Sequence, residues 1–118
     1  MKKIISLILI CILITACNST NYKTIDANEA MDIINTNDVI IIDVRTSEEY
    51  DSEHIDGSIN IPVDIIDSVD YDKNATIIVY CASGMRSASA AKTLINMGYT
   101  NVYNLDGGLI NWGFELVK

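Results

Sequence analysis

Two continuous runs dominated by β-branched residues constrain the fold of this chain more than any other feature of its sequence. Residues 39–44 read VIIIDV and residues 75–80 read ATIIVY. Continuous runs rich in β-branched residues are typical of strands that are buried on both faces of a parallel sheet. Helical patterns follow both runs, and strands that alternate with helices indicate an α/β fold. We therefore predict a mostly parallel central sheet with helices packed on its faces.

Capping and turn residues place the remaining elements. Asp26 with Glu29, and Thr46 with Glu49, form two capping boxes that each predict the start of a helix. We expect the first of these helices to run to about residue 35 and to end at residues 37–38. Further expected elements are short strands at 22–25, 58–61 and 102–105, helices at 63–69 and at 87–97 with Gly98 after its end, and a turn and terminal helix from Gly107 with Trp112 packed inward.

The amino-terminal segment has the composition of a targeting signal rather than of a domain. Lys2 and Lys3 precede the apolar run 4–14, which is shorter than the roughly 20 residues of a membrane-spanning helix. The string Ile14-Thr15-Ala16-Cys17 resembles the lipobox of bacterial lipoproteins, in which the cysteine carries two acyl chains and becomes the first residue. An ordinary signal peptide or a short anchor with an incidental cysteine is the alternative.

This resemblance divides the chain into three parts. We expect a signal peptide at 1–16, a lipidated tether at 17–21 and one domain at 22–118, a length typical of a single domain. Lipid on Cys17 would hold the domain at the membrane surface on the extracytoplasmic side, in a periplasm or at the cell surface.

The charge of the chain argues against binding to nucleic acid. The net charge is −8, from 16 acidic and 8 basic residues. Without Lys2 and Lys3, six basic residues stand against the same 16 acidic ones, so the predicted domain carries −10. Such a domain repels phosphate backbones.

Of the three cysteines in the sequence, one remains as a free thiol. Cys11 lies in the predicted signal and Cys17 would be consumed by lipid, so Cys81 is the only free thiol of the predicted domain. No disulfide within the domain and no Cys-x-x-Cys pair can form, and one Cys with one His does not make a zinc cage. We predict neither a metal nor a cofactor.

The segment between the run 75–80 and the following helix has the features of a reactive-cysteine loop. A thiol at the amino end of a helix faces unpaired N–H groups and the positive end of the helix dipole, which stabilise a thiolate. Gly84 lets the loop curl around an anion, and Arg86 adds a planar cation suited to an oxyanion. A buried, inert cysteine is the other interpretation of Cys81. The candidate site comprises Cys81 as nucleophile and, as substrate-binding residues, Ala82, Ser83, Gly84, Met85, Arg86 and Ser87.

The motif Cys-x-x-Gly-x-Arg-Ser at 81–87 resembles the active-site loop of single-domain rhodaneses. Asp56 and Ser58 stand where Pro and Ala are common in that family. The resemblance covers about residues 22–116 and implies a rhodanese-like three-layer α/β fold. It is also carried by residues 42–45 (IDVR), 49–50 (EY), 54–58 (HIDGS) and 60–62 (NIP), and by Gly107-Gly108 with Trp112.

What this resemblance implies is sulfur transfer. Cys81 would attack the outer sulfur of a thiosulfate-like anion and hold it as a persulfide, which cyanide or a thiol would then accept. Loop N–H groups from Ala82 to Ser87 would stabilise the persulfide, and Arg86 would orient the donor. We expect Asp43 and Arg45 to form a structural ion pair, and His54 to be a scaffold residue rather than a base.

Two other functions fit parts of the pattern. The first is a phosphatase or arsenate reductase, because tyrosine phosphatases also use a Cys loop that ends in Arg. Their loops place Arg six residues after Cys, whereas the step from Cys81 to Arg86 is five, which makes a tighter cradle that suits one sulfur better than a tetrahedral phosphate. A non-catalytic binding module, or a sensor of sulfide or oxidants that uses Cys81, is the second alternative. The sequence indicates no particular protein partner.

Overall fold

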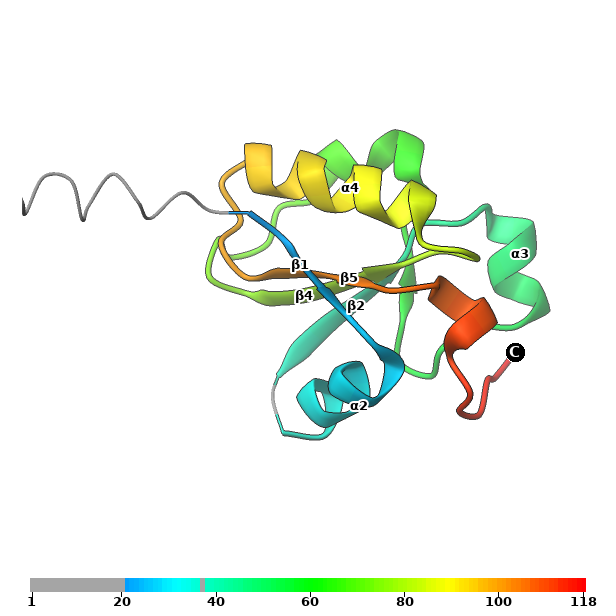
Figure 1. Cartoon of the computed structure of the whole chain (residues 1–118). Helices are drawn as coiled ribbons and strands as arrows, with labels where there is room; N and C mark the ends of the chain where they lie inside the picture. The colour runs from blue at the N-terminus through cyan, green and yellow to red at the C-terminus, as the bar shows by residue number, and fades with distance from the viewer. Residues whose placement is uncertain (1–20, 37) are drawn as a thin grey trace, which may run out of the picture.

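The computed structural model describes residues 21–36 and 38–118 as a layered α/β domain (Figure 1). The predicted signal peptide, Cys17, residues 18–20 of the tether and residue 37 lie outside the described residues. The strands are β1 (Lys23–Ile25), β2 (Val39–Asp43), β3 (Ile59–Asn60), β4 (Thr76–Tyr80) and β5 (Val102–Leu105), and the helices are α2 (Ala27–Thr36), α3 (Ser47–Ser52), η1 (Val63–Ser68), α4 (Met85–Asn96) and η2 (Gly108–Asn111).

The five described strands form one sheet in the order β1-β5-β4-β2-β3, and every neighbouring pair is parallel. The two apolar runs are adjacent, with Ile42 of β2 beside Val79 of β4. Their central position explains why both are apolar on both faces, as the sequence predicted. Parallel pairing brings the carboxyl ends of β2 and β4 to the same edge of the sheet.

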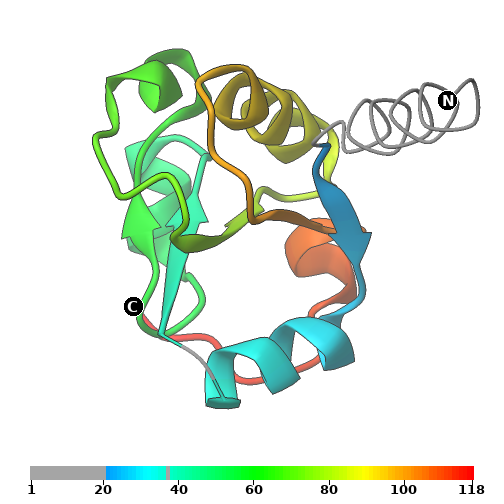
Figure 2. The ribbon, with the colours of Figure 1, turned by 90° about the vertical axis from the view of Figure 1, so that its left-hand side faces the viewer.

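Each face of the sheet buries its own apolar core. Figure 2 shows α4 and η1 on one side of the sheet and α2 on the other. Successive residues of β4 alternate between these sides, so Ile77 and Val79 belong to the α4 core together with Cys81 just after the strand, whereas Ile78 and Tyr80 belong to the α2 core. Trp112 packs into the α2 core and is 3% exposed, which confirms its predicted inward position.

Both predicted capping boxes are present. The Asp26 carboxylate accepts the N–H of Glu29 at 2.8 Å, and the Thr46 hydroxyl accepts the N–H of Glu49 at 3.2 Å. In both boxes the glutamate carboxylate accepts the N–H of the capping residue in return.

Several helix predictions were wrong in detail. The helix predicted at 87–97 begins two residues earlier, because Gly84 at φ +104° serves as its cap and Met85 already has helical geometry. The segments predicted as helices at 63–69 and after residue 107 are 3-10 turns. Ile65, with φ −119°, interrupts the first of these.

A buried ion pair fixes the carboxyl end of β2, as predicted for Asp43 and Arg45. The Arg45 guanidinium donates to the Asp43 carboxylate at 2.7 Å and to the Glu53 carbonyl at 2.7 Å. Asp43 is fully buried and Arg45 is 6% exposed. A buried charge without its partner would be strongly destabilising, so this pair holds the loop after β2 in one arrangement.

Within the described residues, no helix has both the length and the apolar character that crossing a membrane requires.

Candidate active site

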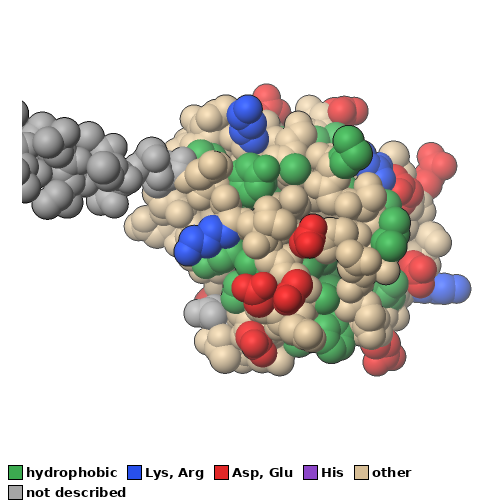
Figure 3. All heavy atoms as spheres, viewed as in Figure 1, with side chains coloured by type: hydrophobic (Ala, Val, Ile, Leu, Met, Phe, Trp, Pro, Cys, Tyr) green, Lys and Arg blue, Asp and Glu red, His purple; other side chains and the backbone are tan. Residues whose placement is uncertain are grey.

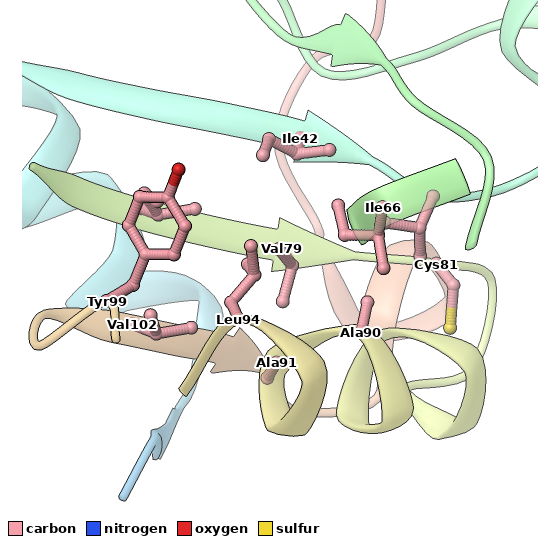
Figure 4. Packing of buried hydrophobic residues seen from close by; sticks show 11 residues of the cluster. Ile42, Ile66, Val79, Cys81, Ala90, Ala91, Leu94, Tyr99 and Val102 are labelled. Carbon is pink, nitrogen blue, oxygen red and sulfur yellow. The ribbon is translucent and has the colours of Figure 1, made fainter. Parts of the chain in front are cut away.

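Cys81 occupies the first position after β4, at the carboxyl edge of the sheet. Figure 4 shows its sulfur directed toward the first turn of α4, beyond Ala90. Ligand sites of open parallel sheets form at this edge, where strands end and helices begin. A hollow of about 440 Å³ lies between the starts of β2 and β4, at the opposite edge, and is therefore separate from the thiol.

The loop after Cys81 curls back so that its donors surround the sulfur. The N–H of Gly84 donates to Sγ at 3.0 Å and the N–H of Ser87 at 3.4 Å. The Ser87 hydroxyl lies 3.4 Å from Sγ and 3.2 Å from the Gly84 carbonyl oxygen, so its one proton can be donated to either acceptor. This arrangement of inward-pointing donors suits a negatively charged sulfur.

Burial and hydrogen bonding act on the thiol in opposite directions. Burial raises the pKa of Cys81, because a thiolate loses hydration. The hydroxyl and N–H of Ser87 and the N–H groups of Gly84 and Ser83 lower it, and the balance leaves the pKa below its ordinary value. Cys81 is only 1% exposed, yet the loop stabilises its charged form. An inert core cysteine lacks such donors and has a raised pKa.

The 3-10 turn η2 supports this loop from outside. The N–H of Leu109 donates to the Cys81 carbonyl at 3.0 Å, and the N–H of Ile110 donates to the Ala82 carbonyl at 3.2 Å. Gly108, at φ +55°, allows the approach, because a Cβ there would overlap the Cys81 carbonyl oxygen and lie 2.8 Å from the Ala82 carbonyl carbon. The absence of a side chain at Gly108 therefore lets η2 contact the active-site loop.

Arg86 has a partner that the sequence did not reveal. Its two terminal nitrogens donate to the two carboxylate oxygens of Glu49, at 2.8 Å and 3.0 Å. The sequence predicts Glu49 as a capping residue of α3 and as part of the family pattern, but no local signal connects it with a residue 37 positions later. Arg86 lies in the first turn of α4 rather than in the loop before it.

The other candidate residues lie around the loop in different environments. Ala82 is partly buried, Ser83 is exposed, and the Met85 side chain is 81% exposed. Asn104 of β5 was missed by the sequence analysis. Its amide donates to the Gly84 carbonyl at 3.4 Å, and its buried oxygen has no hydrogen-bond partner among the described residues.

His54 makes structural contacts away from the sulfur. Its ring stacks on Tyr50 at 3.7 Å between centroids, and its Nδ1 lies 2.8 Å from the Tyr50 carbonyl oxygen. These contacts fit the expected scaffold role. Over residues 21–36 and 38–118, no three His, Cys, Asp or Glu side chains gather closely enough to hold a metal ion.

Comparisons with known proteins match this architecture. The family model described as a rhodanese-like domain matches residues 26–115. The thiosulfate sulfurtransferase GlpE of Coxiella burnetii is 34% identical over 93 residues, which are 77% of this chain and 87% of that protein.

Two solved structures agree with the family match. A rhodanese-like domain protein from Staphylococcus aureus is 34% identical and has a TM-score of 0.73, over 80% of this chain and 96% of that one. A rhodanese with anions from E. coli is 41% identical and has a TM-score of 0.61, over 69% of this chain and 99% of that one.

Replacement of Gly108 tests how closely η2 must approach the loop. We expect Gly108→Ala to lower the free energy of unfolding by roughly 3 kcal/mol or more, because it combines strain at positive φ with a main-chain overlap. Gly57→Ala is the matched control: φ is +83° but no atom lies within 4 Å of the new Cβ, so we expect about 1–2 kcal/mol from φ strain alone. Equal losses in urea unfolding would show that the close approach is unimportant.

The lowered pKa of Cys81 predicts a pH dependence. Ultraviolet titration of the thiolate should give a midpoint below that of the unfolded protein, and Ser87→Ala should raise it while Ser89→Ala, on the exposed side of α4, should not. Because the folded pKa is depressed, this contribution to stability is fully present above the unfolded pKa. It is lost as pH falls through the folded pKa. An unchanged midpoint in Ser87→Ala would contradict the assigned cause.

Proposed function

The chain belongs to the family of rhodanese-like domains, and from that premise we propose that it is a sulfurtransferase in which Cys81 carries sulfane sulfur as a persulfide. The donor is a small thiosulfate-like anion, and the acceptor is a thiol or cyanide. The observation that carries this proposal is the set of donors around Sγ. Gly84 and Ser87 direct their N–H groups to a sulfur whose pKa is lowered despite burial.

The first half-reaction loads the cysteine. The Cys81 thiolate attacks the outer sulfur of the donor, a new S–S bond forms, and the S–S bond of the donor breaks. With thiosulfate, sulfite leaves with the bonding electron pair, and the persulfide anion stays on Cys81. The loop N–H groups that bind the thiolate are placed to bind this anion, so the same donors serve both states.

The second half-reaction transfers the outer sulfur from the Cys81 persulfide to the acceptor. A thiolate or cyanide attacks the outer sulfur, and the S–S bond of the persulfide breaks to restore the Cys81 thiolate. The cycle consumes no external oxidant or reductant, because each step exchanges one bond to the transferred sulfur for another. A covalent intermediate of this kind gives ping-pong kinetics.

We also propose that the domain is a lipoprotein held at the extracytoplasmic face of the membrane by acyl chains on Cys17. The support is the sequence pattern: two lysines, the apolar run 4–14 and the string Ile14-Thr15-Ala16-Cys17. β1 begins at the amino edge of the parallel sheet, whereas Cys81 follows its carboxyl edge. A tether at the amino terminus therefore joins the domain at the edge opposite the thiol.

Persulfide formation can be observed directly. We expect intact-protein mass spectrometry after treatment with thiosulfate to show the addition of one sulfur atom, which cyanide or dithiothreitol removes, and no addition in Cys81→Ser. The serine keeps the size of the loop and removes only the nucleophile. A folded protein with a titratable thiol that no sulfane donor loads would contradict sulfur transfer and favour a sensing or binding module. Cys81-dependent hydrolysis of para-nitrophenyl phosphate would instead favour a phosphatase.

The lipid anchor predicts a difference between two cysteines that are close in sequence. In a bacterial host, Cys17→Ser should abolish labelling by a fatty-acid probe and release the protein from the membrane fraction, while Cys11→Ser, inside the apolar run, should change neither. Labelling that persists in Cys17→Ser would contradict lipidation at this residue.

A further inference from the structure

The ion pair between Arg86 and Glu49 changes the charge at the mouth of the site. Both terminal nitrogens of the guanidinium are occupied by the carboxylate. The side chains are 39% and 34% exposed, so the pair adds little to stability. Its main effect is on charge, because the cation nearest to the loop in sequence is cancelled where an anionic donor would meet it.

Glu49 is held in this position independently of Arg86. One of its carboxylate oxygens also accepts the N–H and the hydroxyl of Thr46, at 3.2 Å and 3.1 Å, as part of the capping box of α3. The hydrogen bond from Arg86 and the bonds from Thr46 lower the pKa of Glu49 to about 2. The carboxylate is therefore ionised throughout the pH range in which the Cys81 thiolate reacts, and α3 orients it toward Arg86.

Two other cations of the domain have partners of their own, away from Glu49. The only other arginine, Arg45, is buried against Asp43. Lys73 lies 4.1 Å from the centre of the Tyr99 ring. Acidic side chains outnumber basic ones on the face shown in Figure 3. The sequence has the same excess, with 16 acidic and 8 basic residues. A dianion therefore approaches a domain on which negative charge predominates.

Apolar side chains border the same loop. Met85 directly precedes Arg86 and is 81% exposed. Ile110, whose N–H donates to the Ala82 carbonyl, is 77% exposed. Because Cys81 is 1% exposed, the terminal sulfur of a donor must enter the loop while the remainder of the donor stays among these side chains. These surroundings suit an apolar substituent better than a second negative charge.

We infer that Glu49 is a specificity-determining residue that neutralises Arg86 and thereby favours sulfane donors of low charge and apolar substituent, such as organic thiosulfonates and persulfides, over the thiosulfate dianion. This inference rests on the proposed function and names the donor class of the same site. Specificity of this kind comes from a repulsive group as much as from an attractive one. With a persulfide donor, the Cys81 thiolate takes the outer sulfur and the donor leaves as a thiolate, so atoms and charge balance.

Thiosulfate and benzenethiosulfonate form a matched pair of probes. Both present an outer sulfur bonded to an oxidised sulfur, and they lose sulfite and benzenesulfinate, respectively. The first is a dianion and the second is a monoanion with an apolar ring. With cyanide as the common acceptor, kcat/KM for the donor reports the loading half-reaction of a ping-pong enzyme. The ratio of the two values then measures discrimination and is independent of how much of the enzyme is active.

The test compares wild type, Glu49→Gln and Glu48→Gln. Glutamine keeps an oxygen for the Thr46 N–H, so the capping box survives while the charge is lost. Glu48 is the exposed neighbour in α3, and its replacement changes the net charge equally without touching Arg86. We expect Glu49→Gln to raise kcat/KM for thiosulfate about tenfold or more, with less than about a threefold change for benzenethiosulfonate. Glu48→Gln should leave both values within about twofold of wild type.

The possible failures are distinguishable. An unchanged ratio in a Glu49→Gln enzyme that still forms the persulfide would overturn the inference and leave the proposed function standing. Equal loss with both donors would show that Glu49 only positions Arg86, and would also overturn it. If neither donor loads Cys81 in any of the three proteins, the proposed function fails and the inference fails with it. The wild-type protein alone provides a further test. Because salt screens the repulsion of the dianion, rising ionic strength should increase the ratio of kcat/KM for thiosulfate to kcat/KM for benzenethiosulfonate, and a constant ratio would contradict the inference.

Discussion

The hydrogen bonds from main-chain N–H groups to the Cys81 sulfur are the interaction on which the rest of the site depends. They form only because β4 ends at Tyr80, directly before Cys81, and α4 begins at Met85, so the chain must turn within the four residues 81–84. Gly84 makes the turn at φ +104°, and η2 supports it through bonds to the Cys81 and Ala82 carbonyls. Packing of the apolar core does not by itself require hydrogen-bond donors directed at a buried sulfur. Here the helix start, the glycine and the supporting turn all serve the charged form of one thiol.

The two arginines of the domain show how burial decides what an ion pair does. Arg45 and Asp43 are buried beneath the carboxyl edge of the sheet, where the loss of either partner would leave an uncompensated charge, so this pair organises the scaffold. Arg86 and Glu49 lie at the surface beside the loop, where water screens the pair and its contribution to stability is small. The consequence that we propose for it is instead electrostatic, at the point where an anionic donor would arrive. A pair of arginine and carboxylate therefore organises the scaffold in one place and, in this proposal, selects the donor in the other.

The sequence predicts those elements of the fold whose signals lie in a short stretch of the chain. The β-branched runs located β2 and β4, and the two capping boxes located the starts of α2 and α3, because each signal lies within a few residues. It predicts a start of α4 at Ser87, whereas Gly84 caps the helix at Met85 and the Ser87 hydroxyl lies near the Gly84 carbonyl and Cys81 Sγ. Contacts across the fold had no local signal. Glu49 with Arg86, and Asn104 with Gly84, join residues that only the folded sheet brings together.

A crystal structure of the protein loaded with sulfane sulfur would test the central claim most directly. We predict a second sulfur atom bonded to Cys81 Sγ, inside the loop and within hydrogen-bond distance of main-chain N–H groups between residues 82 and 87, with Arg86 still paired to Glu49. Unmodified Sγ after treatment with a competent donor, or an outer sulfur directed away from the loop, would contradict it. In either case the donors around Cys81 would stabilise the thiol without serving sulfur transfer.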